Sequence, residues 1–314
     1  MFLYIWQSIA KKMRKRLSLL LLLLLLPFGL RAATPIRVPD LGEKTMVAPR
    51  WFGPNAFPVP EITDGRVKSK PCFELAGDYY RGHLTDGQDD TFDLFLRAWI
   101  PLFSDRVNLS LWMPVVERWY YDRSVWEARR ILSDPDLDPG YGSGDVYVGL
   151  DIQLLTETAR RPAVLVRSVL KTASANCFGY ARDYDSPGYF FDITAGKGWG
   201  PFRVSATTGF LCWQTGTGRQ NDAVQYGLGA FYDGEVVNLS AQWGGYIGWE
   251  RCGDAPMTVR ARIGFDLGQR NSSLTRSISR SCLATARPEP FLQLQQGLQD
   301  YPFTQLRLGC AWRF

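Results

Sequence analysis

Apolar and polar residues alternate with a period of two along most of this chain. In residues 145–154, DVYVGLDIQL, every second residue from Val146 to Leu154 is apolar. From Cys72 onward, no segment keeps apolar residues at helical spacing for more than two turns. Because successive side chains of a strand point to opposite faces, this pattern predicts β-strands. The predicted strands are residues 72–84, 92–102, 107–115, 145–154, 163–173, 189–199, 202–214, 223–233, 236–247, 257–267, 291–299 and 304–314.

The connections between these segments alternate between short and long. The short ones are Ser104-Asp105, 158–162, Gly200-Pro201 and Asp233-Gly234, and the long ones are 82–90, 122–144, 181–188 and 214–222. Short turns on one rim and long loops on the other are typical of an all-β, transmembrane antiparallel up-and-down β-barrel. The 268–290 connection is an exception, because its place in the order predicts a short turn. We predict about twelve strands, with the count around 268–290 left open.

The first 33 residues predict a signal peptide. Five basic residues within 11–16 precede an apolar run over 17–26, and the small pair Ala32-Ala33 follows. The run is shorter than the roughly 20 residues of a spanning helix, which makes an uncleaved anchor the weaker alternative. We therefore predict export with cleavage near Ala33.

Charge and cysteine content limit the partners of the exported chain. Removing residues 1–33 leaves 30 basic against 31 acidic residues, because that segment holds six basic residues and no acid. This balance gives no indication of a nucleic-acid partner. Six cysteines in an exported chain favour disulfides, whose connectivity the sequence leaves open. There is no CxxC motif and only one histidine, so we predict neither a metal site nor a cofactor.

Alternation alone leaves two candidates for the medium at the apolar face, which are lipid and the core of a soluble barrel or sandwich. The exported chain has five lysines against 25 arginines, although water-facing surfaces are usually rich in lysine. The apolar faces run for about 9 to 11 residues, which is the length of a tilted spanning strand. Aromatic residues near predicted strand ends suggest interfacial girdles. These are Trp119, Tyr120, Tyr121, Tyr189, Phe190, Phe191, Trp199, Trp213 and Trp312.

The last strand, TQLRLGCAWRF, carries Leu306, Leu308, Trp312 and Phe314 on one face. It resembles the closing strand of Gram-negative bacterial outer-membrane barrel proteins, which commonly ends in phenylalanine. Cys310 is an unusual occupant of this face. The resemblance implies an outer-membrane location, contact with outer-membrane lipid and lipopolysaccharide, and recognition of the strand ending at Phe314 by the barrel-insertion machinery.

A looser resemblance covers residues 142–233. The stretches GSGDVYVGLDIQLL and GYFFDITAGKGWGPFRVSATTGF are similar to the outer-membrane proteins grouped under the meta-pathway of phenol degradation. That family is thought to pass small, often hydrophobic molecules. The resemblance therefore implies a channel or transporter for small-molecule solutes.

The chain divides into a signal peptide (1–33), a proline-rich leader or plug (34–71) and an outer-membrane β-barrel (72–314). Because hydrocarbon offers no water to an open strand edge, the first strand is expected to pair with the last. Pairing would bring Cys72 and Cys310 to one end of the seam. They form either a disulfide or, as we favour, two separate thiols of which one faces lipid.

The face opposite the apolar one predicts the lumen. Charged residues of both signs lie on it: Glu74, Asp78, Asp93, Arg97, Asp151, Arg167, Lys171, Asp192, Arg203, Arg260, Arg262, Asp266 and Arg307. In a barrel of intermediate size they could line a narrow pore that selects by charge and size. The equal alternative is an ion-pair network that fills the lumen, since unpaired buried charges would be prohibitive.

Two other sites are weaker candidates. Asp134, Asp136 and Asp138 have the alternate spacing of calcium ligands, but the intervening prolines depart from the pattern and favour a solvated loop. A lipid-modifying hydrolase would need an activated hydroxyl, and the single histidine, His83, has only Thr85 nearby in sequence. We assign no catalytic residue. Besides a hydrolase, a structural or adhesive barrel with partner-binding loops is the alternative to a channel.

Overall fold

The computed structural model describes most of the chain from Pro49 onward. The described residues are 49–102, 105–129, 136, 140–175, 187–214, 220–249, 253–267 and 287–314. The predicted signal peptide, residues 34–48 of the leader and most of the 268–290 connection lie outside these ranges. Among the described residues, no helix is both long enough and apolar enough to cross a membrane.

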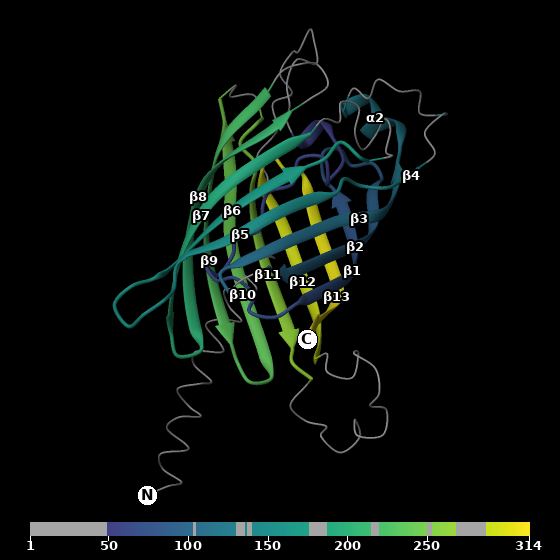
Figure 1. The fold of residues 1–314 in the computed structure, drawn as a ribbon. Coiled ribbons are helices and arrows are strands. Elements are labelled where there is room, and N and C mark those ends of the chain that lie inside the picture. Colours follow the sequence, from purple (N-terminus) through teal and green to yellow (C-terminus); the bar gives the residue numbers. More distant parts are fainter. Residues whose placement is uncertain are drawn as a thin grey trace, which may run out of the picture. The chain divides into compact units, whose positions relative to one another are not determined.

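Long antiparallel strands make up the fold (Figure 1). Their bounds are β1 Cys72–Gly82, β2 Asp89–Pro101, β3 Val107–Tyr121, β4 Tyr141–Gly142, β5 Tyr147–Leu155, β6 Ala163–Lys171, β7 Gly188–Trp199, β8 Phe202–Gln214, β9 Gln220–Asp233, β10 Val237–Gly248, β11 Met257–Phe265, β12 Arg287–Gln299 and β13 Phe303–Arg313. Two short helices accompany them, η2 at Pro49–Trp51 and α2 at Arg123–Arg129.

The sheet closes on itself. β1 pairs with β13 from Cys72↔Arg313 to Gly82↔Phe303, and its other edge pairs with β2. In the described part of the chain, β4 adds two residues beside β3, and the other twelve strands form an antiparallel ring. Closure satisfies the backbone groups that an open edge would leave unpaired. The predicted twelve-strand barrel and the pairing of its first and last strands are confirmed.

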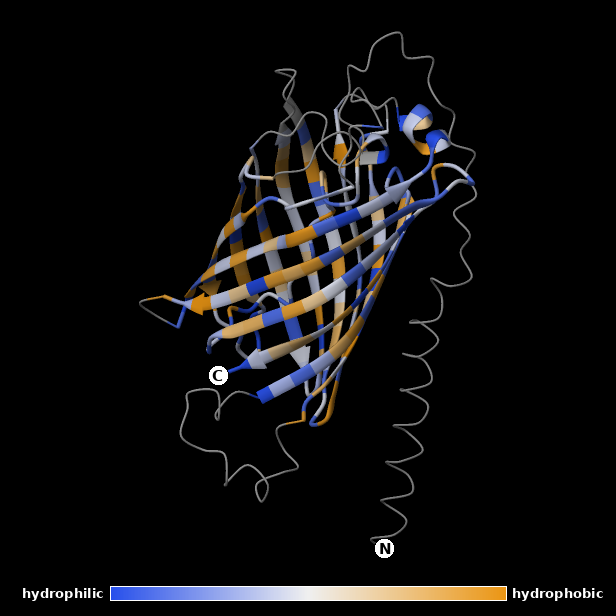
Figure 2. Ribbon diagram, turned by 90° about the vertical axis from the view of Figure 1, so that its right-hand side faces the viewer, coloured by the Kyte–Doolittle hydropathy of each residue, from blue (hydrophilic) through white to orange (hydrophobic). Residues whose placement is uncertain are grey.

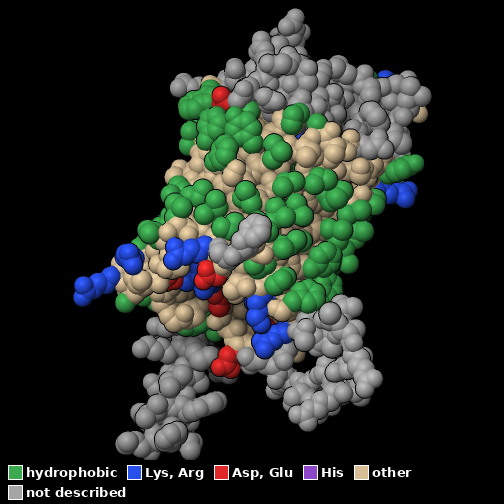
Figure 3. All heavy atoms as spheres, viewed as in Figure 1, with side chains coloured by type: hydrophobic (Ala, Val, Ile, Leu, Met, Phe, Trp, Pro, Cys, Tyr) green, Lys and Arg blue, Asp and Glu red, His purple; other side chains and the backbone are tan. Residues whose placement is uncertain are grey.

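Hydrophobic and hydrophilic residues alternate along the strands (Figure 2), and the burial of the side chains follows this alternation. Apolar side chains in the middle of strands are exposed on the outside, for example Ile193, Leu228 and Leu308. Figure 3 shows hydrophobic side chains over the visible wall between the rims, with charged side chains gathered toward its lower end. Such a wall is the face that a spanning barrel presents to lipid.

β3 extends past its predicted end at Val115 to Tyr121. Leu94 pairs with Val116 and Phe95 with Pro114, which leaves Val115 as an extra residue in a β-bulge. Beyond the bulge the even-numbered residues face outward, so the alternation changes phase. The predicted strand therefore ends at the bulge residue although the observed strand continues.

Several aromatic residues expected in the girdles point inward instead. Trp119, Phe190 and Trp213 are buried, whereas Tyr120, Phe191 and Trp199 are exposed. Neighbouring residues of a strand face opposite sides, so a run of aromatics at a strand end cannot all contact an interface. The girdle interpretation was wrong for the inward set.

The free thiols at the seam face different sides. Cys72 is buried on the interior face, whereas Cys310 pairs across the seam with the exposed Leu75. Both of these cysteines are free thiols. The favoured interpretation of two separate thiols is confirmed, and a Cys72–Cys310 disulfide is excluded by their opposite orientation. Cys177, Cys252 and Cys282 lie outside the described residues.

Residues 49–71 of the leader run through the interior of the barrel (Figure 1). Near the rim of the β12–β13 turn, Arg50 pairs with Asp300 at 3.3 Å. At the opposite rim, where β1 begins and β13 ends, Arg66 pairs with Asp233 at 3.0 Å. We call these the distal rim and the terminal rim. The core of the molecule lies between leader and wall, and is formed by Trp51, Phe52, Ala56, Phe57 and Val59 with Tyr147, Val169, Phe190, Leu211, Trp213, Ala223 and Tyr246.

Candidate functional site

The interior wall is strongly charged. Ten of the predicted lumen residues are buried: Glu74, Asp78, Asp93, Asp151, Arg167, Lys171, Asp192, Arg203, Arg260 and Arg307. Arg97 and Arg262 are partly buried on the same face, and Asp266 is partly exposed just after β11 ends at Phe265. The structure thus brings twelve of these side chains to the strands' interior face and leaves Asp266 at the terminal rim. Their role in solute passage stays a prediction.

Main-chain carbonyls of the leader accept hydrogen bonds from this wall. Tyr301 and Tyr246 donate hydrogen bonds to the carbonyls of Pro54 and Phe57, at 2.9 and 3.3 Å. Further down, Ser205 donates to the Thr63 carbonyl at 2.7 Å. Polar wall residues therefore satisfy carbonyls that an extended buried segment without strand pairing would leave unpaired.

Close contact at the terminal end of the leader depends on two glycines. Gly65 has a φ of +84°, a left-handed conformation that side chains disfavour. A Cβ at Gly65 would lie 2.9 Å from the Gly196 nitrogen on β7, closer than real Cβ atoms approach. The carbonyl of Gly65 accepts a hydrogen bond from Gln153 at 2.9 Å. The leader thus turns at Gly65 where it leaves the lumen, and this turn fits because the wall has a glycine, Gly196, at the point of contact.

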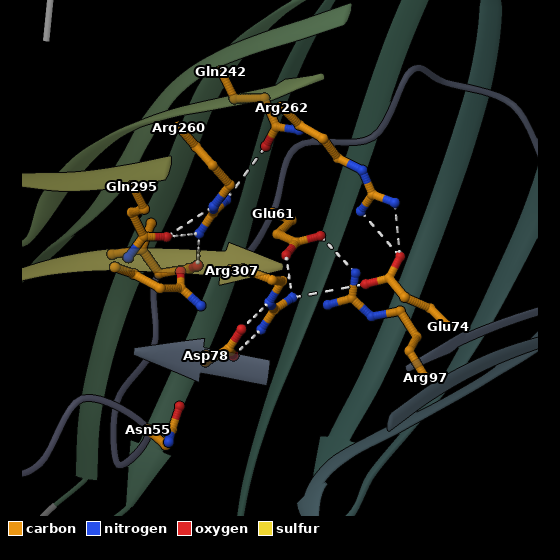
Figure 4. Close-up of polar contacts among 12 residues, drawn as sticks. Asn55, Glu61, Glu74, Asp78, Arg97, Gln242, Arg260, Arg262, Gln295 and Arg307 are labelled. Atoms are coloured by element: carbon orange, nitrogen blue, oxygen red, sulfur yellow. Dashed lines mark hydrogen bonds and ion pairs between the residues drawn. The ribbon is translucent and has the colours of Figure 1, made fainter. Parts of the chain in front are cut away.

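Glu61 of the leader lies at the centre of the charge network (Figure 4). Its carboxylate is 2.7 Å from Arg97 Nη1 and 3.5 Å from Arg307 Nη1. The Glu61 carbonyl also accepts a hydrogen bond from Arg167 at 2.9 Å. One leader residue therefore receives arginine side chains from β2, β6 and β13.

The wall contains ion pairs of its own. Asp78 accepts two hydrogen bonds from Arg307, each of 2.6 Å, across the β1–β13 seam. Glu74 accepts two bonds of 3.0 Å from Arg262, which reaches over from β11. The Asp78–Arg307 contact is bidentate, whereas both bonds from Arg262 end on Oε2 of Glu74. Such charge-assisted contacts make the burial of these charges possible.

Further pairs lie on other strands and toward the rims. Arg167 donates from Nε to Asp192 on the neighbouring strand at 3.0 Å. Near the distal rim, Lys171 pairs with Asp145 at 2.7 Å. At the terminal rim, Arg203 pairs with Glu157 of the β5–β6 turn. Charges of both signs are thus distributed along the whole interior.

Arg97 is surrounded by aromatic rings. Its guanidinium carbon lies 4.9 Å from the ring centroid of Phe95, 5.3 Å from that of Trp99 and 5.6 Å from that of Trp112. Arg307 also stacks on Phe95, with its guanidinium carbon 3.9 Å from the ring centroid. Cation–π contact of this kind holds an arginine in place while leaving its N–H groups free to bind oxygen.

A cavity of about 300 Å³ remains beside the leader. Its walls include Glu61, Lys68, Arg97, Trp112 and Asp151. This volume is at the lower end of the range of small-molecule sites. With the leader in place, the lumen therefore holds a small polar and aromatic chamber.

His83 lies on the outside of the distal rim and does not form a catalytic pair. Its Nε2 is 2.7 Å from the hydroxyl of Thr304, and that hydroxyl donates its single proton to Gln296 at 2.6 Å. The imidazole thus has no proton to take from this hydroxyl. Partial burial lowers the pKa of His83, which keeps the ring neutral near pH 7. The hydrolase interpretation gains no support from this geometry.

Asp134 and Asp138 of the predicted acidic loop lie outside the described residues. Among the residues described, no cluster of three or more histidine, cysteine, aspartate or glutamate side chains has the arrangement of a metal site. The structure instead adds α2 to the predicted long loop. Arg129 of this helix forms a fully buried ion pair of 2.5 Å with Asp89 of β2. At seven residues the helix is too short to show a periodic signal.

Sequence reasoning missed the uncharged polar residues of the interior and the central residue of the leader. Gln242 and Gln295 both bind Arg260, and Gln153 binds the leader. All three lie on the interior face of their strands, like the predicted charged residues. The period-two pattern would therefore have identified them if it had been applied to uncharged polar residues. Glu61 lies in a segment with no periodicity, and no sequence signal marked it.

No protein-family model matches the chain, and no curated protein matches its sequence. In a search of solved structures, an outer membrane channel from Pseudomonas putida F1 superposes with a TM-score of 0.48 at 12% identity, covering 82% of this chain and 100% of that one. The NanC porin gives a TM-score of 0.48 at 7% identity, covering 77% and 100%. The outer membrane phospholipase A of Escherichia coli gives 0.40 at 12% identity, covering 78% and 90%.

Proposed function

We propose that this chain is an outer-membrane channel for small solutes and that its leader, residues 49–71, is the plug of the lumen. The observation that carries the proposal is how the leader is held. Within the described residues, 49–71 form no strand and add nothing to the ring of twelve. The ring of strands is complete without the leader. Contacts with side chains of the wall hold the leader in place.

A segment held in this way can leave without breaking the wall. Each contact along its path is a hydrogen bond, ion pair or apolar contact that water or a solute can replace, whereas the strand ladder remains intact. In the plugged state the ion pairs and the leader fill the lumen, so passage requires the leader to move. The cavity of about 300 Å³ beside it is the space from which a solute could begin to displace it.

The exterior face of the barrel and the sequence support the proposed location in the outer membrane. The exposed mid-strand side chains are apolar, and the predicted signal peptide, cleaved near Ala33, would export the chain. The backbone N–H of Phe314 donates to the Pro71 carbonyl at 3.1 Å, so the final residue is fixed to the start of the barrel. We propose that outer-membrane lipid and lipopolysaccharide surround the wall and that the insertion machinery reads this closing strand.

Solute uptake into proteoliposomes tests the proposal. Purified full-length protein should admit solutes of a few hundred daltons faster than empty liposomes do, and a variant lacking residues 34–71 should admit them faster still. Heat-denatured protein gives the baseline. Uptake at the empty-liposome rate with both forms would overturn the channel and favour a hydrolase or an adhesive barrel.

A further inference from the structure

The arginines around Glu61 are unevenly neutralised by the wall. Arg307 has its own partner there, since it binds Asp78 through two hydrogen bonds of 2.6 Å. In the part of the chain that the structure describes, the ion pair of Arg97 is with Glu61. Glu61 belongs to the leader, so Arg97 depends on a movable residue for charge compensation.

Arg260 is in a similar position. It is buried, and its guanidinium donates to the side-chain oxygens of Gln295 and Gln242, at 2.8 and 3.3 Å, and to the Val59 carbonyl of the leader at 3.1 Å. All three acceptors are neutral. Two buried or partly buried arginines thus face the lumen without a carboxylate of the wall in contact with them.

On the nearby wall, Asp93 accepts a hydrogen bond from Asn55 of the leader, and two further acids bind other arginines. Glu74 is 3.0 Å from Arg262, and Asp192 is bound by Arg167. Asp151 lines the same cavity and offsets part of the positive charge. Once the leader is gone, a surplus of positive charge remains at the level of Arg97. A buried charge without a partner is costly, so this level of the wall favours an incoming anion.

The geometry around Arg97 suits one class of anion. A guanidinium presents its N–H groups in a planar fork that matches a carboxylate, and one of these groups, at Nη1 of Arg97, already donates to the Glu61 carboxylate at 2.7 Å. The rings of Phe95, Trp99 and Trp112 beside it offer apolar surface for the rest of a molecule. The adjoining cavity of about 300 Å³ has room for a small ring-bearing acid.

We propose that Arg97, Arg260 and Arg307 form a solute site for small organic carboxylates, and that Glu61 of the leader occupies it as a stand-in for the solute. The proposal rests on the proposed channel function and names its substrate class. A carboxylate solute and Glu61 compete for the same arginines. Binding of the solute therefore also weakens the hold on the leader.

Benzoate titration of the full-length protein in detergent, followed by calorimetry, tests this competition. Glu61→Gln keeps the shape of the side chain and removes its charge, so we expect benzoate to bind roughly tenfold more tightly than to the wild type. Adding Arg97→Gln to Glu61→Gln should abolish the gain. Glu127→Gln on the exposed face of α2 is the matched control and should bind benzoate like the wild type.

Two further probes separate charge from shape. Benzyl alcohol and benzylamine have the ring of benzoate without its negative charge, and neither should gain affinity from Glu61→Gln. Equal benzoate affinities in the wild type and Glu61→Gln would overturn the proposal, as would a preference of Glu61→Gln for benzylamine. If Glu61→Gln does not fold, the benzoate affinities of the wild type and of Arg97→Gln are compared instead. Weaker binding is expected in Arg97→Gln, and equal binding would contradict the site.

The uptake assay on the same preparations distinguishes this inference from the channel itself. Solute uptake without a benzoate gain in Glu61→Gln would overturn the carboxylate site and leave the channel standing. Benzoate binding with the expected gain, but without uptake, would support the site and overturn the channel.

Discussion

At the scale of single residues, the seam of the barrel is stabilised by a buried ion pair. Asp78 and Arg307 are register partners on β1 and β13, and both are almost fully buried. Removing one charge from such a pair leaves the other charge buried without a partner. The resulting loss of stability is larger than the stability that the intact pair contributes.

Asp78→Asn should therefore lower the free energy of unfolding by about 3 kcal/mol. Urea unfolding of protein inserted in lipid vesicles, followed by tryptophan fluorescence, measures the change. Asp105→Asn, in the exposed β2–β3 turn, is the matched control and should change stability little. A loss no greater than that of the control would show that the seam does not depend on the pair.

The terminal rim contains a carboxylate whose charge is stabilised in the folded state. A hydrogen bond of 2.8 Å from the Gly198 amide, and after it the contact with Arg203, lower the pKa of Glu157 despite partial burial. A lowered pKa means that folding favours the charged form of Glu157. The contribution of this carboxylate to folding stability is therefore complete above its ordinary pKa of 4.5, and it is lost as pH falls through the lower pKa of the folded state.

We expect Glu157→Gln to be less stable than the wild type at pH 7 and the gap to narrow as pH falls below 4.5. Urea unfolding of both proteins in detergent at a series of pH values checks this. A gap that stays constant down to the acid limit of the barrel, or that widens, would contradict the assignment.

At the scale of elements, the strands were predictable and the connections between leader and wall were not. Period two identified every long strand, because each strand separates an apolar face from a polar one. The phase change at Val115 concealed the distal part of β3. The alternation along β8 places Trp213 on the same inner face as Arg203, and this was overlooked. Glu61 acquires its role only through contacts with three distant strands, which no local pattern encodes.

The leader packs most closely where the wall has no side chains. Ile62 lies against Gly227 of β9 and Gly244 of β10, which are register partners. A Cβ at Gly227 would overlap the end of the Ile62 side chain. Enlarging this position should therefore push the leader away without breaking the strand.

Gly227→Ala should speed hydrogen exchange in peptides covering 57–64 by roughly tenfold or more, because overpacking typically costs 1–3 kcal/mol. The double variant with Ile62→Ala should return exchange to near the wild-type rate. Gly77→Ala, where a Cβ would make only an ordinary contact of 4.0 Å with the Asp93 carbonyl oxygen, is the control. Exchange that is unchanged in Gly227→Ala, or not restored in the double variant, would show that this contact does not hold the leader.

At the scale of the whole molecule, the account requires hydrocarbon around the wall. Ile193 is exposed in the middle of β7, whereas Val236 is exposed in the β9–β10 turn at the terminal rim. Ile193→Arg should destabilise the protein in lipid vesicles by about 2–4 kcal/mol, and Val236→Arg by no more than about 1 kcal/mol. Equally small effects in urea unfolding would indicate water, not lipid, at the wall.

Closure of the ring and an apolar exterior make a barrel, but a channel also needs a lumen that can open. Leader and wall are separate in the strand pairing and joined by the contacts of Glu61 and the core around Phe57. The central claim is that removing the leader opens a pore in a wall that stays folded.

Single-channel conductance in a planar bilayer tests that claim most directly. Full-length protein should give small or brief currents, and protein lacking residues 34–71 should give larger and steadier ones, with both showing the heat-modifiable gel shift of a folded barrel. Equal conductance in the two forms, or no current from either, would contradict the account.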